Sequence, residues 1–463
     1  MYSRHDLDDT IVALATAPGM AAIAVIRVSG PEAIELVKSC FKGKNLEKEA
    51  SHTVHLGYIL DENQDTIDQV LVTLFKAPHS YTGEDTVEIS CHGSAYIQQE
   101  ILNRMTGLGA RAAGRGEFTF RAFIHGRMDM TQAESVADLI AAESKAETQL
   151  ALSQLKGGIS KEIALLRSQL IHFASMLELE LDFGEEDVEF ADRSQLKTLL
   201  TDAIEKIRIL LDTFKLGDAI KTGINTVIAG RPNAGKSTLL NVLLQEERAI
   251  VSDIPGTTRD TIEEVLHIEG IPFRLIDTAG IREAQDQIEA IGVQRTHDKI
   301  RQSSILLYVF DVTELNPAQV QSDIAVLKHP DLEVILIPNK MDLNPYAKPE
   351  DYVMGGITRG DIIPTSARNN MNIVYLKERL LESIVKDNAR LSQNILTNSR
   401  HVDCLQKVNE HLSRALIQVS SNSGHELIAM DIRQALHYLG EITGEISTED
   451  LLESIFTRFC IGK

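Results

Sequence analysis

The sequence is poor in cysteine and has no long apolar run, and both absences exclude classes of protein. Its four cysteines lie far apart, without CxxC or Cys/His ligand spacing, so we expect reduced thiols and neither a disulfide framework nor a zinc site. No run approaches the ~18 uncharged apolar residues of a membrane span, and the start, MYSRHDLDDT, lacks the pattern of a signal peptide. We therefore expect a cytoplasmic protein with no membrane contact.

Basic residues are also scarce relative to acidic ones. The chain has 46 Lys and Arg against 67 Asp and Glu, a formal net charge of -21. Such a surface opposes non-specific binding to nucleic acid, because phosphate neutralisation needs clustered Lys and Arg. Any contact with nucleic acid must therefore use a local basic patch or a second protein.

The 463 residues are enough for several hydrophobic cores. The composition and the spacing of apolar residues change along the sequence. Residues 1–125 read as mixed helix and strand, with strand-like runs such as AAIAVIRVSG and QVLVTLFKA. Residues 126–220 and 387–463 carry apolar positions at helical spacing, as in Ile163, Leu170 and Leu177. Residues 221–386 alternate strand-like runs, among them INTVIAG, ILLYVFDVT and IIPTSA, with helical runs, which predicts a largely parallel sheet wound on both faces. We infer an α/β domain inserted into an all-α domain built from two segments, behind an α+β domain.

The segment GRPNAGKS, Gly230 to Ser237, follows a predicted strand and opens a predicted helix. In this context GxxxxGK[ST] indicates a phosphate-binding P-loop. Its backbone N–H groups can surround phosphate oxygens, Lys236 can reach the β and γ phosphates, and Ser237 can ligate Mg²⁺. A Gly-rich turn without function is the simpler alternative, and the strand–helix context disfavours it.

Three further motifs follow in order: DTAG (277–280), NKMD (339–342) and TSAR (365–368). Asp277 is suited to the Mg²⁺ shell, and the N–H of Gly280 to the γ-phosphate. Asp342 can accept hydrogen bonds from the N1–H and 2-amino groups that guanine has and adenine lacks, and the Ala367 N–H can meet the base O6. Together the motifs resemble those of translation-factor-like GTPases and favour GTP over ATP.

The residues that catalyse hydrolysis are less easily identified from the motifs. Ras-like enzymes orient the attacking water with a Gln after DxxG, but Ile281 occupies that place. The side-chain oxygen of Asn233 lies beside the phosphates, and the segment SDIPGTTRD supplies Thr258 and loop carbonyls that can surround a monovalent cation in place of an arginine finger. Glu283 and Glu289 can position water, although residue chemistry alone favours solvated helix positions for both.

The strings GRPNAGKS, GTTRD, DTAGIRE and the terminal FCIGK, with the α/β insertion within helices, resemble the tRNA modification GTPase MnmE family, also called TrmE. The resemblance covers essentially the whole chain. It implies a homodimer that, in a heterotetramer with the flavoprotein MnmG (GidA), modifies carbon 5 of the wobble uridine, position 34, of certain tRNAs to an aminomethyl or carboxymethylaminomethyl group. The one-carbon donor would be 5-formyl- or 5,10-methylene-tetrahydrofolate, and GTP hydrolysis would need Mg²⁺ and K⁺.

The implied fold is an N-terminal folate-binding and dimerisation domain, a helical domain in two parts and a Ras-like GTPase domain. Within the last, the resemblance implies Mg²⁺ ligands at Ser237 and Thr258, and Glu289 rather than Glu283 as general base through a bridging water. The implied K⁺ ligands are Asn233, Ser252, Ile254 and Thr257. The predicted GTP contacts are Asn233, Ala234, Gly235, Lys236, Ser237, Thr238, Ser252, Thr257, Thr258, Asp277, Thr278, Ala279, Gly280, Asn339, Lys340, Asp342, Ser366, Ala367 and Arg368.

In the N-terminal domain the resemblance implies folate contacts at Arg27, Glu88 and Lys463. A fourth implied contact is Arg127, where a lysine can be found in the family; Arg keeps the charge with a different geometry. The stretch SCHGS departs from a more Gly-rich family form. Residues 111–127 carry a net charge of +3, compatible with an anion such as the folate glutamate or tRNA phosphate, although a plain basic surface is the simpler interpretation.

The tail FCIGK places a thiol close to the C-terminal end of the sequence. Chemistry alone favours an adventitious cysteine, but the apolar spacing of DLLESIFTRFC predicts a final helix that packs and holds the tail. The resemblance makes Cys460 a candidate catalytic residue, as nucleophile, proton donor or positioning group, and requires the tail to reach an N-terminal domain, its own or the partner's. Two other functions stay open: a GTP-dependent RNA or ribosome-assembly switch without modification chemistry, and an N-terminal block that serves only dimerisation.

Overall fold

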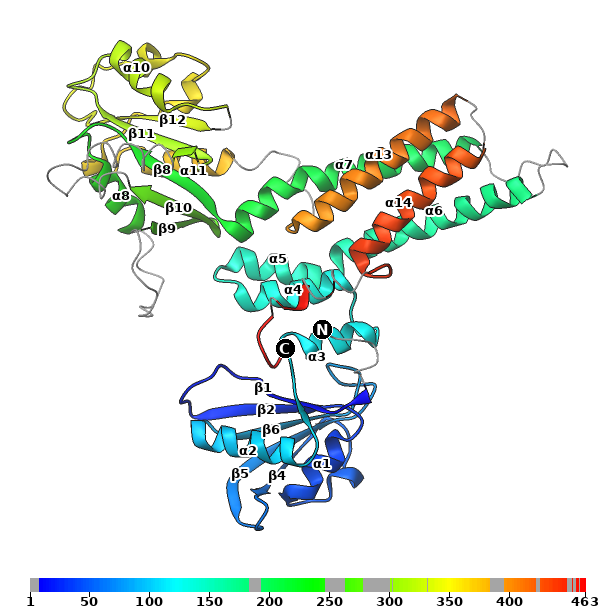
Figure 1. Cartoon of the computed structure of the whole chain (residues 1–463). Helices are drawn as coiled ribbons and strands as arrows, with labels where there is room; N and C mark the ends of the chain where they lie inside the picture. The colour runs from blue at the N-terminus through cyan, green and yellow to red at the C-terminus, as the bar shows by residue number, and fades with distance from the viewer. Residues whose placement is uncertain are drawn as a thin grey trace. The chain divides into compact units, whose positions relative to one another are not determined.

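The computed structural model describes residues 8–182, 193–245, 263–277, 300–301, 303–330, 332–383, 395–421, 425–447, 452, 455–457 and 459–463. The chain divides into two compact units (Figure 1). The first comprises Met1–Ala141, Ala151–Ile204 and Asp403–Lys463, and the second Ala142–Leu150 and Glu205–Val402. Among the described residues no helix combines the length and the apolarity that crossing a membrane requires. The domain boundaries at 125, 220 and 386 stay predictions.

The N-terminal part of the first unit is a seven-stranded sheet in the order β3-β4-β5-β6-β2-β1-β7. Its strands are β1 (Ile11–Leu14), β2 (Ile23–Ser29), β3 (Phe41–Lys42), β4 (Thr53–Leu60), β5 (Thr66–Phe75), β6 (Thr86–His92) and β7 (Arg111–Ala112). Helices α1 (Ala33–Cys40) and α2 (Ala95–Gly107) lie on one face (Figure 1). They pack on Ala24, Ile26 and Val28, which alternate along β2, so the residues between them face the other side.

Within the part of the chain that the structure describes, the opposite face of this sheet is covered only in part. Beside β1, Phe118 of helix α3 (Glu117–Ile124) packs with Ile11 and Ala13. On β4 and β5, by contrast, Leu56 and Leu71 stand directly opposite each other and are 62% and 45% exposed. An apolar surface therefore extends over β4 and β5 on the same face as the side chains that point away from α1 and α2.

Helices form the rest of the first unit. They are α4 (Met130–Ala141), α6 (Gly158–Asp182), α14 (His425–Thr443) and parts of α5 (Lys145–Leu155), α7 (Arg193–Thr222) and α13 (Ser399–Ser420). Helix α6 packs along α14 and buries Ile163, Leu170 and Leu177, the stripe that the sequence predicts.

The second unit contains a five-stranded sheet in the order β12-β11-β8-β10-β9. Its strands are β8 (Ile224–Ala229), β9 (Glu263–Ile268), β10 (Ile271–Asp277), β11 (Ile305–Asp311) and β12 (Glu333–Asn339), and its helices include α8 (Lys236–Gln245), α10 (Pro317–Leu327) and α11 (Ile373–Glu382). All pairs are parallel except β9–β10. Apolar residues of α10 pack on one face and those of α8 and α11 on the other, which confirms the doubly wound fold.

One predicted strand of this sheet is reduced to a single bridge. The run IIPTSA was expected to form a strand, but only Ile362 pairs with Leu336 of β12, beside hydrogen bonds from Ile363 N to Leu336 O and from Thr365 N to Pro338 O. These two donors are alternate residues, so Pro364 between them faces away from β12, whereas Pro338 of β12 has no N–H with which to continue the ladder. The segment still follows β12 and delivers Thr365–Ala367 to the carboxyl edge of the sheet.

Candidate functional site

The phosphate loop of the second unit joins β8 to α8, as the motif predicts. Its residues Gly230, Asn233 and Gly235 have positive φ angles of 149°, 61° and 95°. A Cβ on Gly230 would lie 1.9 Å from the Val309 carbonyl oxygen, and one on Gly235 would lie 2.2 Å from Asn339 Nδ2. Only glycine fits either place, so the loop stays tight at the N-terminus of α8, where backbone N–H groups and the helix dipole favour an anion.

Lys236 closes across this loop. Its side chain is buried, and Nζ donates hydrogen bonds to the carbonyl oxygens of Gly230 and Arg231, both at 2.9 Å. These two acceptors offset the burial of the ammonium. Phosphate oxygens are stronger, charged acceptors at the same place, so the loop and its lysine fit a phosphate group.

Asn339 connects the phosphate loop to the two motifs predicted to bind the base. Its Nδ2 donates to the Ala234 carbonyl at 2.8 Å, and its Oδ1 accepts the N–H of Ala367 at 3.0 Å. The Ser366 hydroxyl donates to Asp342 Oδ1 at 2.7 Å. NKMD and TSAR therefore meet at the sheet edge, although the Ala367 N–H must share or exchange its bond to Asn339 to reach a base oxygen.

An ion pair also fixes the NKMD segment. Lys340, at a positive φ of 62°, pairs with Asp311 at the end of β11, with 2.6 Å between Nζ and Oδ2. Burial raises the pKa of Asp311, but hydrogen bonds from Lys340 and Thr313 outweigh it and hold the pKa below its usual value. Asp342, which stands beyond this anchor, is exposed at the place predicted for the guanine edge.

Other predicted residues of this site lie outside the described residues: Ser252, Ile254, Thr257, Thr258, Thr278, Ala279, Gly280 and Glu289. Asp277 ends β10 opposite Ile228 of β8, at the predicted edge of the sheet. Ser237, Thr238, Asn233 and Arg368 are exposed around the loop. The Ser237 hydroxyl and the Asn233 amide are oxygen ligands of the type that Mg²⁺ and a monovalent cation accept. Their assignment as metal ligands stays a prediction, and the described residues hold no group of three His, Cys, Asp or Glu that fits a metal ion.

A second group of predicted residues meets in the first unit. Arg27 of β2 and Glu88 of β6 stand directly opposite each other and form an ion pair of 2.8 Å. The Arg27 guanidinium also lies 5.4 Å from the ring centre of Tyr81 and 5.6 Å from that of Phe118. A charged pair thus rests on two aromatic faces, an arrangement suited to a planar, polar ligand.

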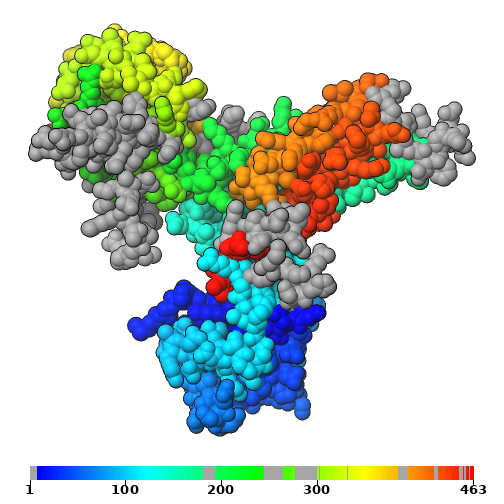
Figure 2. Space-filling view, in the orientation of Figure 1, coloured from blue at the N-terminus to red at the C-terminus, as the bar shows by residue number. Residues whose placement is uncertain are grey.

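The C-terminal tail docks beside this pair in its own chain. Arg27 donates to the Gly462 carbonyl oxygen at 3.3 Å, the Gly116 N–H donates to the Cys460 carbonyl oxygen at 3.4 Å, and Ile461 bridges to Arg115. Upstream, buried Phe456 and Phe459 join the apolar cluster of α3 and α4, so the packing that the spacing predicts is present. The red C-terminal residues are visible at the surface in Figure 2.

The two predicted side chains of the tail, Lys463 and Cys460, lie in different environments. Lys463 Nζ lies 6.0 Å from the ring centre of Tyr81. Burial and the Arg27 charge lower the pKa of this ammonium, against the opposing effect of Glu88. Cys460, in contrast, is exposed, whereas the other three cysteines are buried. The tail therefore brings a lysine to the Arg27–Glu88 pair and leaves its thiol accessible.

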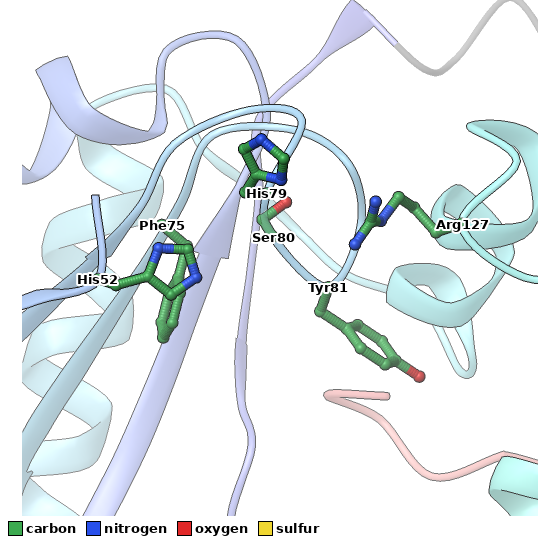
Figure 3. A pocket seen from close by; sticks show the side chains of 6 residues that line it. All are labelled: His52, Phe75, His79, Ser80, Tyr81 and Arg127. Carbon is green, nitrogen blue, oxygen red and sulfur yellow. The ribbon is translucent and has the colours of Figure 1, made fainter. Parts of the chain in front are cut away.

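Arg127 lies on the other side of Tyr81. With His52, Phe75, His79, Ser80 and Tyr81 it lines an open cavity of about 430 Å³ (Figure 3). The described residues of the lining carry cationic, neutral and aromatic groups and no carboxylate, which suits an anion beside a ring. Tyr81 thus contacts both the Arg27–Glu88 pair and the cavity of Arg127. Sequence reasoning missed this residue because an aromatic in a polar turn belongs to no recognisable motif.

Sequence reasoning also missed the ion pairs of Arg111 and Arg121. Arg121 is fully buried; its Nη1 donates to Glu84 Oε1 at 3.0 Å, and its Nη2 donates to Asp9 and Glu117. Arg111 also pairs with Asp9 and Glu117. Two of the four arginines in segment 111–127 are therefore paired with carboxylates, and Arg127 is the arginine of this segment that lines the cavity.

A mainly parallel sheet with a phosphate loop after its central strand, and with Asn339, Asp342 and Ser366 gathered at the same edge, defines a P-loop nucleotide-binding protein. Comparison with known families assigns nearly the whole chain. Residues 10–127 match the model described as "GTP-binding protein TrmE N-terminus", and residues 130–460 match "MnmE helical domain".

Curated relatives agree with the family models. Proteins named "tRNA modification GTPase MnmE" are 52% identical in Cytophaga hutchinsonii, over 98% of both chains, and 48% identical in Christiangramia forsetii, over 99% of this chain and 100% of that one. A third, from Parabacteroides distasonis, is 45% identical over 98% and 100% of the two chains. The chain belongs to the MnmE (TrmE) family of tRNA modification GTPases, as its motifs predict.

Proposed function

We propose that the protein hydrolyses GTP and, with MnmG, modifies carbon 5 of the wobble uridine of certain tRNAs with a one-carbon tetrahydrofolate. The observation that carries the proposal is the junction at Asn339, which joins the phosphate loop to Ala367 in a chain of this family. A guanine-reading Asp342 beside a phosphate loop supports GTP as the nucleotide. The cytoplasm, where tRNA is modified, is the proposed location.

In this account the residues of the phosphate loop share the work of binding. Lys236, held by the Gly230 and Arg231 carbonyls, donates its third N–H to the β and γ phosphates, and Ser237 and Thr258 would hold Mg²⁺. Asn233, with loop oxygens of Ser252, Ile254 and Thr257, holds K⁺. These cations supply the positive charge that an arginine finger supplies elsewhere. Glu289 acts as the base on the attacking water.

The N-terminal site takes the folate in the same account. Arg27 and Glu88 offer a donor fork and an acceptor to a planar heterocycle, and Lys463 adds a cation over the same tyrosine. Arg127, in the cavity of Figure 3, binds the anionic glutamate end. Tyr81 separates the two ends and stacks on the ligand. Cys460, four residues from Phe456 and exposed, is left available to the modification chemistry.

The exposed face of β4 and β5 supports a homodimer. Val54, Leu56 and Leu71 form an apolar group on the outer face of the N-terminal sheet. Surfaces of this kind on an otherwise acidic, charged protein mark association sites. A second copy of the chain is the proposed occupant, and Leu56→Asp with Leu71→Asp is expected to yield monomers in analytical ultracentrifugation.

The enzymatic part is tested by GTP turnover in equal concentrations of KCl and NaCl. We expect clear activity in KCl, much less in NaCl, and none above background for Lys236→Ala. Equal rates in both salts would remove the potassium requirement and leave the GTPase. No turnover in either salt would remove the GTPase itself.

The folate part is tested by calorimetry with 5-formyltetrahydrofolate. Arg27→Met is expected to abolish binding, because it removes the donor fork and leaves Glu88 unpaired. Lys38→Met is the matched control, since Lys38 forms an exposed ion pair with Glu47 in the same domain. Loss of folate binding in both variants, or no heat of binding with the wild-type protein, would contradict the assignment and favour a plain dimerisation module.

A further inference from the structure

We infer that Asp323 is a positioning residue for nucleotide binding, which acts by holding Arg231 of the phosphate loop and is itself held by Tyr308. Arg231 meets Asp323 in a two-point contact, with 2.9 Å from Nε to Oδ2 and 3.1 Å from Nη2 to Oδ1. The Tyr308 hydroxyl donates to the same Oδ2. Three elements, the loop, α10 and β11, are joined at one carboxylate.

The main chain of Arg231 links this contact to the functional lysine. Its carbonyl oxygen accepts one of the two hydrogen bonds from Lys236 Nζ, and it also accepts the N–H of Ala234 at 3.4 Å. The side chain of Arg231 is thus fastened to α10, while its backbone supports Lys236. Movement of Arg231 would displace an acceptor of the lysine and the turn that places Asn233.

The chemistry of Arg231, Asp323 and Tyr308 favours a persistent contact. The fork of Arg231 matches a carboxylate in the planar geometry that a lysine cannot reproduce. Burial and the negative charge of Asp323 raise the pKa of the Tyr308 hydroxyl, which therefore stays a donor at neutral pH. Tyr308 is itself 2% exposed and fixed within β11, so it gives Asp323 a rigid point of attachment.

The expected effect falls on affinity and not on the chemical step. Arg231 contacts α10, on the outer side of the loop, and its side chain has no place in the base or water assignments above. A loop held in its binding conformation loses less conformational freedom when phosphate binds. Removal of the tether is therefore expected to weaken GDP and GTP alike. Once GTP is bound, its phosphates hold Lys236 and the loop in place, so the turnover of bound GTP stays the same.

A double-mutant cycle tests the inference, which rests on the proposed nucleotide site. The variants are Arg231→Gln, Asp323→Asn and the pair, and the readouts are the Kd of a fluorescent GDP analogue and kcat at saturating GTP. Each single change is expected to raise Kd by about threefold to fivefold, as for a partly exposed ion pair. The pair is expected to raise it no further, because the second change removes an interaction already lost. Tyr308→Phe is expected to raise Kd less, with kcat unchanged in all variants.

The matched control is the Arg359–Glu350 pair of the same unit, an exposed contact of 2.8 Å. Arg359→Gln and Glu350→Gln are expected to leave Kd unchanged. Additive effects of Arg231→Gln and Asp323→Asn, or a lower melting temperature with Kd unchanged, would overturn the inference. If Arg231→Gln or Asp323→Asn fails to fold, Tyr308→Phe decides alone. An unchanged Kd in Tyr308→Phe would then count against the proposed role of Asp323. Wild-type protein that binds no GDP would instead contradict the proposed function.

Discussion

Arg27 donates a hydrogen bond to the carbonyl oxygen of Gly462, 435 positions later in the chain, at 3.3 Å. The same guanidinium pairs with Glu88 on the neighbouring strand. One arginine therefore holds both a strand-to-strand ion pair and the C-terminal tail. This relationship places the tail of the chain at the N-terminal site and makes its docking accessible to direct tests.

The first prediction concerns the glycine at this contact. Gly462 has a φ of +93°, and a Cβ there would lie 2.3 Å from the Leu14 carbonyl oxygen. Gly462→Ala is therefore expected to release the tail, and the Gly116 N–H, which bonds to the Cys460 carbonyl, should exchange faster with deuterium. Gly109→Ala is the control, because Gly109 also has a positive φ but no atom within 4 Å of the added Cβ. Equal exchange at Gly116 in wild type and Gly462→Ala would contradict the docked tail.

The second prediction concerns the thiols. Burial raises the pKa of the Cys40 and Cys91 thiols to about 11, and Cys404 is buried as well. In native protein at about pH 8 a disulfide reagent is therefore expected to react rapidly with Cys460 alone, since thiolate and access are both required. Cys460→Ser should remove the fast phase, and Cys404→Ser should not. Two or more fast thiols would contradict the burial of the other three.

The third prediction concerns the phosphate loop. Gly235→Ala would place a Cβ 2.2 Å from Asn339 Nδ2, the atom that bonds to the Ala234 carbonyl. Displacement of this junction at a positive φ is expected to weaken GDP binding by about tenfold or more. Gly360→Ala, where the nearest atom is Thr358 Oγ1 at 3.8 Å, should bind GDP normally. Normal GDP affinity in Gly235→Ala would show that the junction does not shape the site.

The fourth prediction concerns acid stability. Burial raises the pKa of Asp9, but hydrogen bonds from Arg111 and Arg121 outweigh it and hold the pKa below its ordinary value of 3.8. Because this pKa is lower in the folded state, the stabilisation by Asp9 is complete above pH 3.8 and is lost as the pH falls through the lowered pKa.

Urea unfolding of the full chain, followed by circular dichroism from about pH 5 down to pH 2, checks the sign. Wild type is expected to lose stability more steeply below about pH 4 than Asp9→Asn, which has already lost the contribution. Asp8→Asn, at the exposed neighbouring position, controls for the loss of one charge. Parallel pH curves for wild type and Asp9→Asn would contradict the assignment.

The sequence predicts the phosphate site well because its signals are local. GRPNAGKS needs its glycines for contacts within one loop, and the apolar runs of β8, β11 and β12 are buried on both faces, so each is recognisable alone. The IIPTSA run failed as a strand because Pro338 of the neighbouring strand β12 has no N–H for the ladder, an effect that the apolar pattern of the run does not show. The meeting of Asn339 with Ala234 and Ala367 follows from the order of parallel strands.

The N-terminal site was less predictable because it depends on distant contacts. Counting charges in residues 111–127 indicates a basic patch, yet Arg121 is fully buried and paired with Glu84 and Asp9. Spacing predicts that Phe456 packs, but not that Gly116 accommodates it with a φ of +68°. Tyr81 has no motif at all. Partners of this kind emerge only when the fold places remote segments together.

The central claim is that this chain modifies the wobble uridine, and nucleoside analysis tests it most directly. Mass spectrometry would compare tRNA from a deletion strain with tRNA from the strain expressing wild type, Lys236→Ala, Cys460→Ser or, as control, Cys404→Ser. We expect aminomethyl-type uridines to disappear on deletion, to return with wild type and Cys404→Ser, and to stay absent with Lys236→Ala and Cys460→Ser. Unchanged nucleosides on deletion would contradict the claim and favour a GTP-dependent RNA or ribosome-assembly switch.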